Sequence, residues 1–274
     1  MNEPKLYRKH KSLQTTDNIY VIENFLKLIQ WKNCENQTAL DVGCGDGLTT
    51  MEILLPKLPK SLNKLLGCDV SDKMIKFAKE VCKNGQLDFC QLNIGNSEDC
   101  MDYHASFDYV FSFYCLHWIP DQRSVFENIY NMLKPGGDIL LSFLGTNPIF
   151  DVYQNISKKI IWAKYLRPEM ISPYHNCEDP GKVLKKMLLE IGFENCKCVV
   201  EDRQFIFPNL KLLEGSIVAV NPTLPQLDSE EKVQYLEDFM NEIAKIYKYD
   251  CDNNNEGKID VNYKLIIVYA SKPN

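Results

Sequence analysis

The sequence predicts an α/β fold built on a mostly parallel sheet of seven strands. Five apolar segments of strand length alternate with segments of helical spacing, and they lie at 38–42, 64–69, 87–94, 107–113 and 138–144. Strands that are apolar on both faces and alternate with helices are typical of a parallel sheet with right-handed crossovers. Two later apolar segments, at 194–200 and 262–270, complete the predicted sheet.

The spacing of apolar residues places the helices between these strands. Apolar positions from Ile19 to Ile29 predict a first helix that begins near Thr16. The same spacing predicts further helices from Asp46 onward and at 71–83, 121–133, 179–191, 208–220 and 228–248. Residues 146–175 are rich in aromatic side chains and are interrupted by prolines, which indicates an irregular segment.

The charge and the distribution of apolar residues argue against a nucleic-acid-binding protein, a secreted protein and a membrane protein. The chain has 274 residues, with 31 Lys and Arg against 37 Asp and Glu, so its net charge of −6 argues against a nucleic-acid partner. The first residues lack the apolar core of a signal peptide, and no run approaches the ~18 apolar residues of a membrane helix. We therefore expect a cytoplasmic protein without stable membrane insertion, and a homodimer stays open.

Two groups of residues resemble metal sites only superficially. The eleven cysteines form no Cys-x-x-Cys pair, so we expect reduced thiols and no metal. Residues 252–260 imitate the first positions of a calcium loop, but Tyr263 stands where the bidentate glutamate belongs. We interpret this segment as a polar turn before the last strand.

A glycine loop follows the first predicted strand. Residues 41–47 read D-V-G-C-G-D-G, and glycines here let a ligand lie against the main chain at a helix N-terminus. The spacing is G-x-G-x-G, because Leu48 stands where the dinucleotide fingerprint has its third glycine. Asp69 closes the second strand, where a carboxylate suits a ribose diol. Together these features predict a nucleoside-binding site.

The glycine loop, Asp69 and the turn at 134–137 resemble those of class I S-adenosylmethionine-dependent methyltransferases. More specific strings are Ser-Leu-Gln at 12–14, Leu-His-Trp at 116–118 and Pro-Ile-Phe-Asp-Val-Tyr at 148–153. These resemble the insect juvenile hormone acid O-methyltransferases, from about residue 6 to the final strand. The resemblance implies a Rossmann-like fold with a helical substrate-binding cover. It also implies methyl transfer from S-adenosylmethionine to the carboxylate of an isoprenoid acid, either juvenile hormone acid or farnesoic acid.

The predicted elements and the resemblance together divide the chain by role, with the cover segments read from the order of the elements. Residues 1–30 would be a helical segment over the active site, and residues 31–145 the cofactor-binding core. An aromatic lid would span 146–178. The rest of the core sheet would come from 179–204 and 259–274, with a helical cover inserted at 205–250.

Cofactor contacts implied by the resemblance lie at the ends of the first four strands. Asp41 would lie near the methionine amino group, and Asp69 would hold the ribose hydroxyls. Asn93 would edge the adenine, although relatives commonly have Asp there; its side-chain carbonyl can still accept a hydrogen bond. The full implied set is Asp41, Gly43, Cys44, Gly45, Gly47, Asp69, Val70, Asn93, Ile94 and Ser112, with Ser112 under the transferring methyl group.

Gln14 and Trp118 match the pair that holds the substrate carboxylate in this family. A carboxylic acid with a pKa near ~4.3 is ionised at pH 7, so no general base is needed. Neutral donors orient the carboxylate without stabilising the charge that disappears in the transition state. His117 is the third catalytic candidate, as a polar support, a general base or a packing residue. The expected substrate-binding residues are Gln14, Trp118, Ile149, Tyr153, Met170 and Tyr174, although the aromatic ones could instead form the core of the lid.

Two other functions stay open on the sequence. One is methylation of a different small apolar acid, such as a fatty acid. The other is a non-catalytic protein that only binds S-adenosylmethionine.

Overall fold

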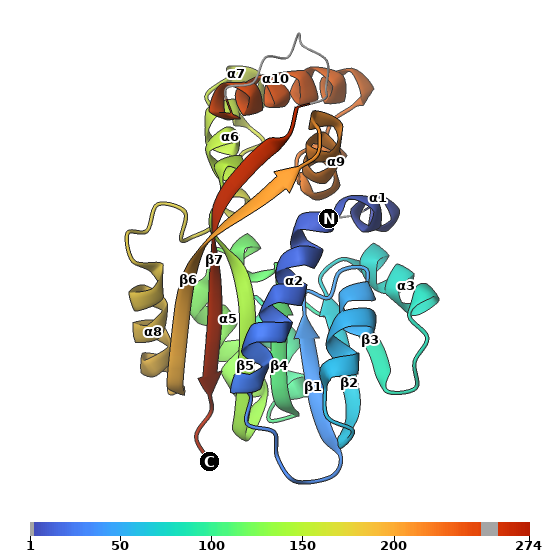
Figure 1. The fold of residues 1–274 in the computed structure, drawn as a ribbon, viewed down its shortest axis with the longest axis vertical. Helices are drawn as coiled ribbons and strands as arrows, with labels where there is room; N and C mark the ends of the chain where they lie inside the picture. The colour runs from blue at the N-terminus through green and yellow to red at the C-terminus, as the bar shows by residue number, and fades with distance from the viewer. Residues whose placement is uncertain (1–2, 248–256) are drawn as a thin grey trace.

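Seven strands of the described residues form one sheet in the order β3-β2-β1-β4-β5-β7-β6 (Figure 1). The computed structural model describes residues 3–247 and 257–274. Neighbouring strands from β3 to β5 are parallel, whereas β7 runs antiparallel to both β5 and β6. The predicted seven-stranded, mostly parallel sheet is therefore confirmed. The strands are β1 (Gln37–Val42), β2 (Leu62–Asp69), β3 (Leu87–Gln91), β4 (Phe107–Phe113), β5 (Leu133–Thr146), β6 (Glu194–Phe207) and β7 (Ile259–Ser271).

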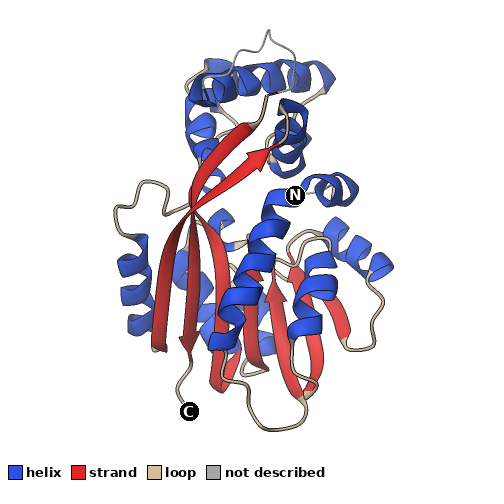
Figure 2. Ribbon diagram, in the orientation of Figure 1, coloured by secondary structure: helices blue, strands red, loops and turns tan. Residues whose placement is uncertain are grey.

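Helices lie on both faces of the sheet (Figure 2). They are α1 (Pro4–His10), α2 (Ser12–Phe25), α3 (Asp72–Val81), α4 (Ser97–Cys100), α5 (Gln122–Met132), α6 (Pro148–Ile156), α7 (Ile160–Ala163), α8 (Pro180–Ile191), α9 (Leu210–Val220) and α10 (Ser229–Tyr247). Tyr109 and Phe111 of β4 pack in the core that includes α2, and Val110 packs in the core with α5 and α8. Because alternate side chains enter opposite cores, β4 is buried along its whole length.

The two C-terminal strands carry a second layer of helices above the sheet. β6 and β7 stay paired as far as Phe207 and Ile259, and they rise into a group formed by α6, α7, α9 and α10, which we call the cover (Figure 1). The cover has an aromatic core in which Trp162 packs edge-on against Tyr235, with ring centroids 5.2 Å apart. β6 is longer than the predicted 194–200 because its pairing with β7 continues into the cover.

Two local predictions differ from the structure. The segment after the glycine loop is a π-helical turn at Thr50–Leu54 and a 3₁₀ turn at Leu55–Lys57, rather than a regular helix. Pro56 lacks the N–H that an α-helix would need there, so the helix cannot continue. The predicted turn at 134–137 lies within β5, where the pairing register with β4 shifts between Phe107 and Tyr109.

The ten cysteines of the described residues are all free. In the same part of the chain, no group of His, Cys, Asp and Glu side chains could hold a metal ion. No helix there is long and apolar enough to cross a membrane. Residues 252–256 of the calcium-like segment lie outside the described residues.

Candidate active site

Two cavities lie at the carboxyl ends of the parallel strands. The strand order reverses between β1 and β4, and open α/β sheets bind ligands at such a switch point. The strand-end cavity has a volume of about 620 Å³ and is lined by residues after β1, β2, β3 and β4. The cover cavity, of about 80 Å³, lies between the strand ends, α2 and the cover.

The strand-end cavity and the cover cavity adjoin each other. Tyr7, Tyr114, Trp118 and Val220 line both of them. These residues come from α1, from the chain just after β4, and from α9, so separate parts of the chain form the junction. A group bound in one cavity therefore faces a group bound in the other at this point.

The glycine loop lies close against neighbouring backbone at the strand-end cavity. Gly43 has a φ of +74°, and a Cβ atom there would lie 2.3 Å from the Cβ and Sγ atoms of Cys115. The N–H groups of Gly43 and Cys44 both donate to the carbonyl of Cys68, at 2.7 and 2.9 Å. Gly43 is therefore required both for the backbone conformation and for the close approach of the chain that follows β4.

Asp69 lines the strand-end cavity with its carboxylate held in place by backbone donors. One carboxylate oxygen accepts the N–H of Gly45 at 3.1 Å, and the other accepts the N–H of Ser71 at 2.8 Å. Each oxygen can accept a second hydrogen bond. Asp69 can therefore accept hydrogen bonds from a ribose diol, which fits an adenosine-containing cofactor.

Asp41 lies behind the glycine loop and does not line either cavity. Its carboxylate is buried and accepts a 2.6 Å hydrogen bond from the hydroxyl of Thr50. Burial raises the pKa of Asp41 to about 7, with Thr50 opposing the rise and Asp69 adding to it. A cation bound beside this carboxyl group would favour its ionised form.

Asn93, Ile94 and Val70 also line the strand-end cavity, and of these Ile94 is buried. Val70 is 62% exposed. The side-chain oxygen of Asn93 already accepts the N–H of Gly95 at 3.0 Å, so one of its acceptor positions is occupied. Only one further acceptor position of this oxygen is therefore free for the adenine amino group that we expected Asn93 to bind.

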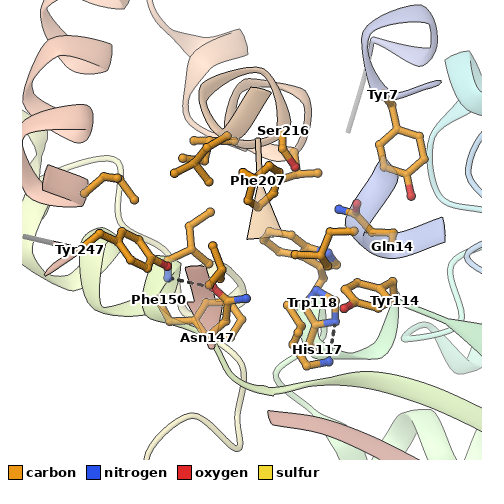
Figure 3. A pocket seen from close by; sticks show the side chains of 18 residues that line it. Tyr7, Gln14, Tyr114, His117, Trp118, Asn147, Phe150, Phe207, Ser216 and Tyr247 are labelled. Carbon is orange, nitrogen blue, oxygen red and sulfur yellow. Dashed lines mark hydrogen bonds between the residues drawn. The ribbon is translucent and has the colours of Figure 1, made fainter. Parts of the chain in front are cut away.

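Gln14 and Trp118 both line the cover cavity, although they come from distant parts of the chain (Figure 3). The side-chain oxygen of Gln14 is buried without a hydrogen-bond partner. Buried polar atoms normally have partners, so an unpaired amide oxygen beside a cavity marks Gln14 as a side chain whose hydrogen bonding a ligand can complete, with its NH₂ group as the donor to an anion. The ring of Trp118 lies 5.1 Å from that of His117, centroid to centroid.

His117 is held as a neutral ring below the cover cavity. Its Nδ1 atom accepts the N–H of Leu144 at 3.4 Å, which leaves the proton on Nε2. Burial lowers the pKa of His117 to about 3. A group with so low a pKa is a poor general base at neutral pH, so the geometry favours the polar-support interpretation.

Comparison with known proteins agrees with this arrangement. Residues 40–139 match the family model described as a methyltransferase domain. The chain is 40% identical to juvenile hormone acid O-methyltransferase of Bombyx mori, across 99% of this chain and 98% of that protein. It is 31% identical to the Drosophila melanogaster enzyme of the same name, across 99% and 93% of the two chains. The chain belongs to the juvenile hormone acid O-methyltransferase family.

Membership of this family confirms the predicted methyltransferase activity and the S-adenosylmethionine cofactor. The fold is also that of solved methyltransferases. A Bacillus halodurans protein described as a methyltransferase superposes with a TM-score of 0.59 at 21% identity, across 94% of this chain and all of that chain. The predicted Rossmann-like class I fold is thereby confirmed.

Several of the cofactor residues expected for a juvenile hormone acid O-methyltransferase do not line the strand-end cavity. A Cβ atom at Gly47 would lie 2.8 Å from Phe89, so this glycine allows the loop to pack on β3. Ser112 is fully buried and donates to the carbonyl of Val42 at 2.8 Å, which joins β4 to β1. Cys44 and Gly45 are likewise absent from the lining. The side chains of Cys44 and Ser112 thus support the loop from within the core, and their contact with cofactor stays a prediction.

The predicted substrate residues separate in a similar way. Ile149 lines the cover cavity, whereas Tyr153 packs against Phe239 inside the cover and Met170 lies in the same core. Tyr174 belongs to the core on the other face of the sheet, where its hydroxyl donates to the side chain of Gln122 at 3.3 Å. Sequence patterns show that these residues are apolar or aromatic but do not show which of their neighbours they face.

Phe150, which the sequence placed in the aromatic segment expected to hold the apolar chain, also lines the cover cavity. The other apolar and aromatic lining residues were not predicted as site residues: Tyr7, Leu13, Tyr114, Leu144, Phe207, Leu213, Ile217, Val220, Ile243 and Val261. Asn147, Ser216 and Tyr247 add polar groups to the same lining (Figure 3). The helical spacing of Leu213, Ile217 and Val220 was the one available signal, and it indicates a buried face without indicating a cavity.

Proposed function

We propose that this enzyme transfers the methyl group of S-adenosylmethionine to the carboxylate of juvenile hormone acid or farnesoic acid. The observation that carries this proposal is the junction at Tyr114 and Trp118 between two unlike cavities. The strand-end cavity presents the carboxylate of Asp69, and the cover cavity is mostly apolar with amide and indole donors. Such a pair of cavities suits a polar nucleoside on one side and a long apolar acid on the other.

The cofactor supplies an electrophilic methyl group on a sulfonium. In the proposed complex, Asp69 accepts hydrogen bonds from the ribose, and Gly43 lets the methionine part lie against the main chain. Asp41 faces its amino group from behind the glycine loop, while Ile94 and Asn93 edge the adenine. Gly45, Gly47, Cys44 and Ser112 hold this loop and its neighbouring strands in place.

The substrate carboxylate lies between Gln14 and Trp118 in the proposed complex. Both residues donate hydrogen bonds without carrying charge. One carboxylate oxygen attacks the methyl carbon as the carbon–sulfur bond breaks, so the acid becomes a neutral ester. No proton has to be removed, which agrees with the low pKa of His117. Alignment of the two reactants can supply up to ~7–11 kcal/mol of the barrier reduction.

The apolar chain of the acid lies along Ile149 and Phe150 under the cover. The volume of the cover cavity, about 80 Å³, is too small for such a chain, since ligand sites usually measure ~300–1,000 Å³. We therefore expect α6, α9 and α10 to move apart when substrate enters. From its charge of −6 we further propose that the enzyme has no nucleic-acid partner. A cytoplasmic location and a homodimer stay predictions.

The direct test is incubation of the protein with S-adenosylmethionine and farnesoic acid, with palmitic acid in parallel. Methyl ester and S-adenosylhomocysteine are both measured. We expect ester from farnesoic acid and much less from palmitic acid. Ester from neither acid, with cofactor bound, would refute the substrate assignment, and preferential methylation of palmitic acid would favour the fatty-acid alternative.

Substitution of Trp118 by Phe tests the carboxylate contact in the same assay. The change keeps an aromatic ring but removes the indole N–H, so we expect kcat/KM for the acid to fall about tenfold, as for the loss of one hydrogen bond to a charged group. The Kd for S-adenosylmethionine should change less than twofold. An equal loss of cofactor affinity would show that Trp118 supports the fold instead.

A further inference from the structure

Asp17 lines neither cavity and lies at the centre of a buried hydrogen-bond cluster. Its carboxylate is 1% exposed. One oxygen accepts the hydroxyls of Tyr114 at 2.5 Å and Tyr263 at 2.8 Å. The other accepts the Nη2 and Nε groups of Arg203 at 3.0 and 3.2 Å. The two tyrosine hydroxyls and the guanidinium thus give this carboxylate four hydrogen bonds from protein donors.

The cluster joins the two segments that carry the proposed carboxylate-binding pair. Gln14 lies three residues before Asp17 on α2, and residues at this spacing share one face of a helix. Tyr114 lies four residues before Trp118 and lines both cavities. It has a φ of +58°, and its N–H donates to the carbonyl of Ser142 at 2.8 Å. The hydrogen bond from Tyr114 to Asp17 thus connects the turn that holds Trp118 to the helix that holds Gln14.

The same cluster reaches the strands that carry the cover. Arg203 belongs to β6 and Tyr263 to β7, and these two residues are register partners. Arg203 also lies over the ring of Tyr20 from α2, at 3.9 Å from its centroid. Because β6 and β7 hold α9 and α10, the position of α2 is coupled to the cover through one carboxylate.

Arg203 also balances the charge of Asp17 beside a site that must accept an anion. The guanidinium forms an ion pair with Asp17 and lines neither cavity, so it does not reach the substrate. An unpaired carboxylate next to Gln14 would repel the acid. The ion pair therefore leaves Gln14 and Trp118 as neutral donors.

We infer that Asp17 is a positioning residue, which sets the separation of Gln14 and Trp118 by holding α2 against Tyr114. This inference rests on the proposed function, because it assigns the two positioned side chains to the substrate carboxylate. Asp17 touches neither reactant. Its effect should appear in the use of the acid rather than in binding of the cofactor.

The two tyrosines that donate to the same oxygen of Asp17 provide a matched test. Tyr114→Phe and Tyr263→Phe each remove one buried hydroxyl from that oxygen, but only Tyr114 lines the cavities. KM and kcat for farnesoic acid, the Kd for S-adenosylmethionine and the midpoint of thermal unfolding are measured for both variants. We expect a KM about tenfold higher for Tyr114→Phe and less than twofold higher for Tyr263→Phe, and a Kd for S-adenosylmethionine that Tyr263→Phe leaves unchanged. Equal changes in KM would overturn the inference.

Asp17→Asn, alone and combined with Gln14→Leu, supplies the second measurement. Asn keeps the shape of the side chain but loses the ion pair, so we expect kcat/KM to fall at least tenfold in the otherwise unchanged enzyme. In the Gln14→Leu background the same change should alter kcat/KM less than threefold, because the positioned group is already absent. Additive losses would mean that Asp17 only supports the fold. Absence of ester from the unmodified enzyme would overturn the proposed function itself, and the inference with it.

Discussion

The ammonium group of Lys11 contacts both carboxylate oxygens of Asp46, at 2.6 and 2.7 Å. Asp46 lies in the glycine loop with its side chain 1% exposed, and Lys11 lies between α1 and α2 with its side chain 11% exposed. The ion pair therefore fixes the N-terminal segment, which carries Tyr7 and Gln14, to the loop that borders the strand-end cavity. The segment closes over both cavities for this reason.

Replacement of Lys11 by Ala should loosen this closure. Asp46 would keep the N–H of Leu48 but lose its charged partner, and breaking such a pair costs about 3 kcal/mol. We expect weaker binding of S-adenosylmethionine by isothermal titration calorimetry and a lower unfolding midpoint. Lys9→Ala is the matched control, because Lys9 is exposed on α1. Similar behaviour of the two variants would mean that the ion pair does not hold the segment.

The glycine loop should tolerate no side chain at Gly43. A Cβ atom would lie 2.3 Å from Cys115 on a backbone with a φ of +74°, so we expect Gly43→Ala to destabilise the protein by about 3 kcal/mol through overpacking and strain. Apart from its own chain neighbours, Gly85 has no atom within 4 Å of its Cβ position, and Gly85→Ala should change stability by less than about 0.5 kcal/mol. Chemical denaturation measures both values. Equal stability of the two variants would contradict the contact with Cys115.

Asp41 should make the stability of the cofactor-free protein depend on pH. Its pKa is raised from 3.8 to about 7 by burial, so the folded state holds a proton that the unfolded state has released between these values. The raised pKa of Asp41 adds to the free energy of unfolding. This contribution is complete below about pH 4 and is lost as the pH rises to about 7. Asp41→Asn can still accept from Thr50 but does not ionise. The unfolding midpoint of Asp41→Asn minus that of the unmodified protein should therefore increase from pH 5 to pH 8. Thermal scans at each pH measure both midpoints. A constant difference would show that Asp41 is ionised throughout.

His117 should not govern the pH dependence of the reaction. With its pKa lowered to about 3 by burial, the ring is neutral throughout the neutral range. We expect kcat/KM for farnesoic acid to be flat from pH 6 to pH 8, both in the unmodified enzyme and in His117→Gln, which can still accept the N–H of Leu144. The substitution should lower kcat several-fold by disturbing the support of Trp118. A rising limb near pH 6.5 that disappears in the variant would instead identify His117 as a general base.

Much of the core could be predicted because its signals are local. The apolar segments from Thr38 to Leu144 predicted the parallel strands, and the glycine loop followed by Asp69 predicted the nucleoside side of the site. Gln14, His117, Trp118 and Ile149 could be named from short strings alone, and the structure brings all four to the cover cavity. Tyr153, Met170 and Tyr174 do not line that cavity, and their contact with substrate stays a prediction. The sequence could not separate these residues from the cavity lining, because the same aromatic and apolar side chains occur in a lid core and in a ligand cavity.

The sequence by itself determined the α/β alternation, the glycine loop and the family, since each depends on residues that are close together along the chain. Only the tertiary structure decided which side chains share an environment. Asp17 and Tyr263 lie at opposite ends of the chain, yet they form a 2.8 Å hydrogen bond because α2 packs on β5, the strand beside β7. The low pKa of His117 and the raised pKa of Asp41 arise in the same way. Both pKa shifts depend on how far segments from distant parts of the chain exclude water from the titratable group. A local sequence pattern cannot predict that exclusion.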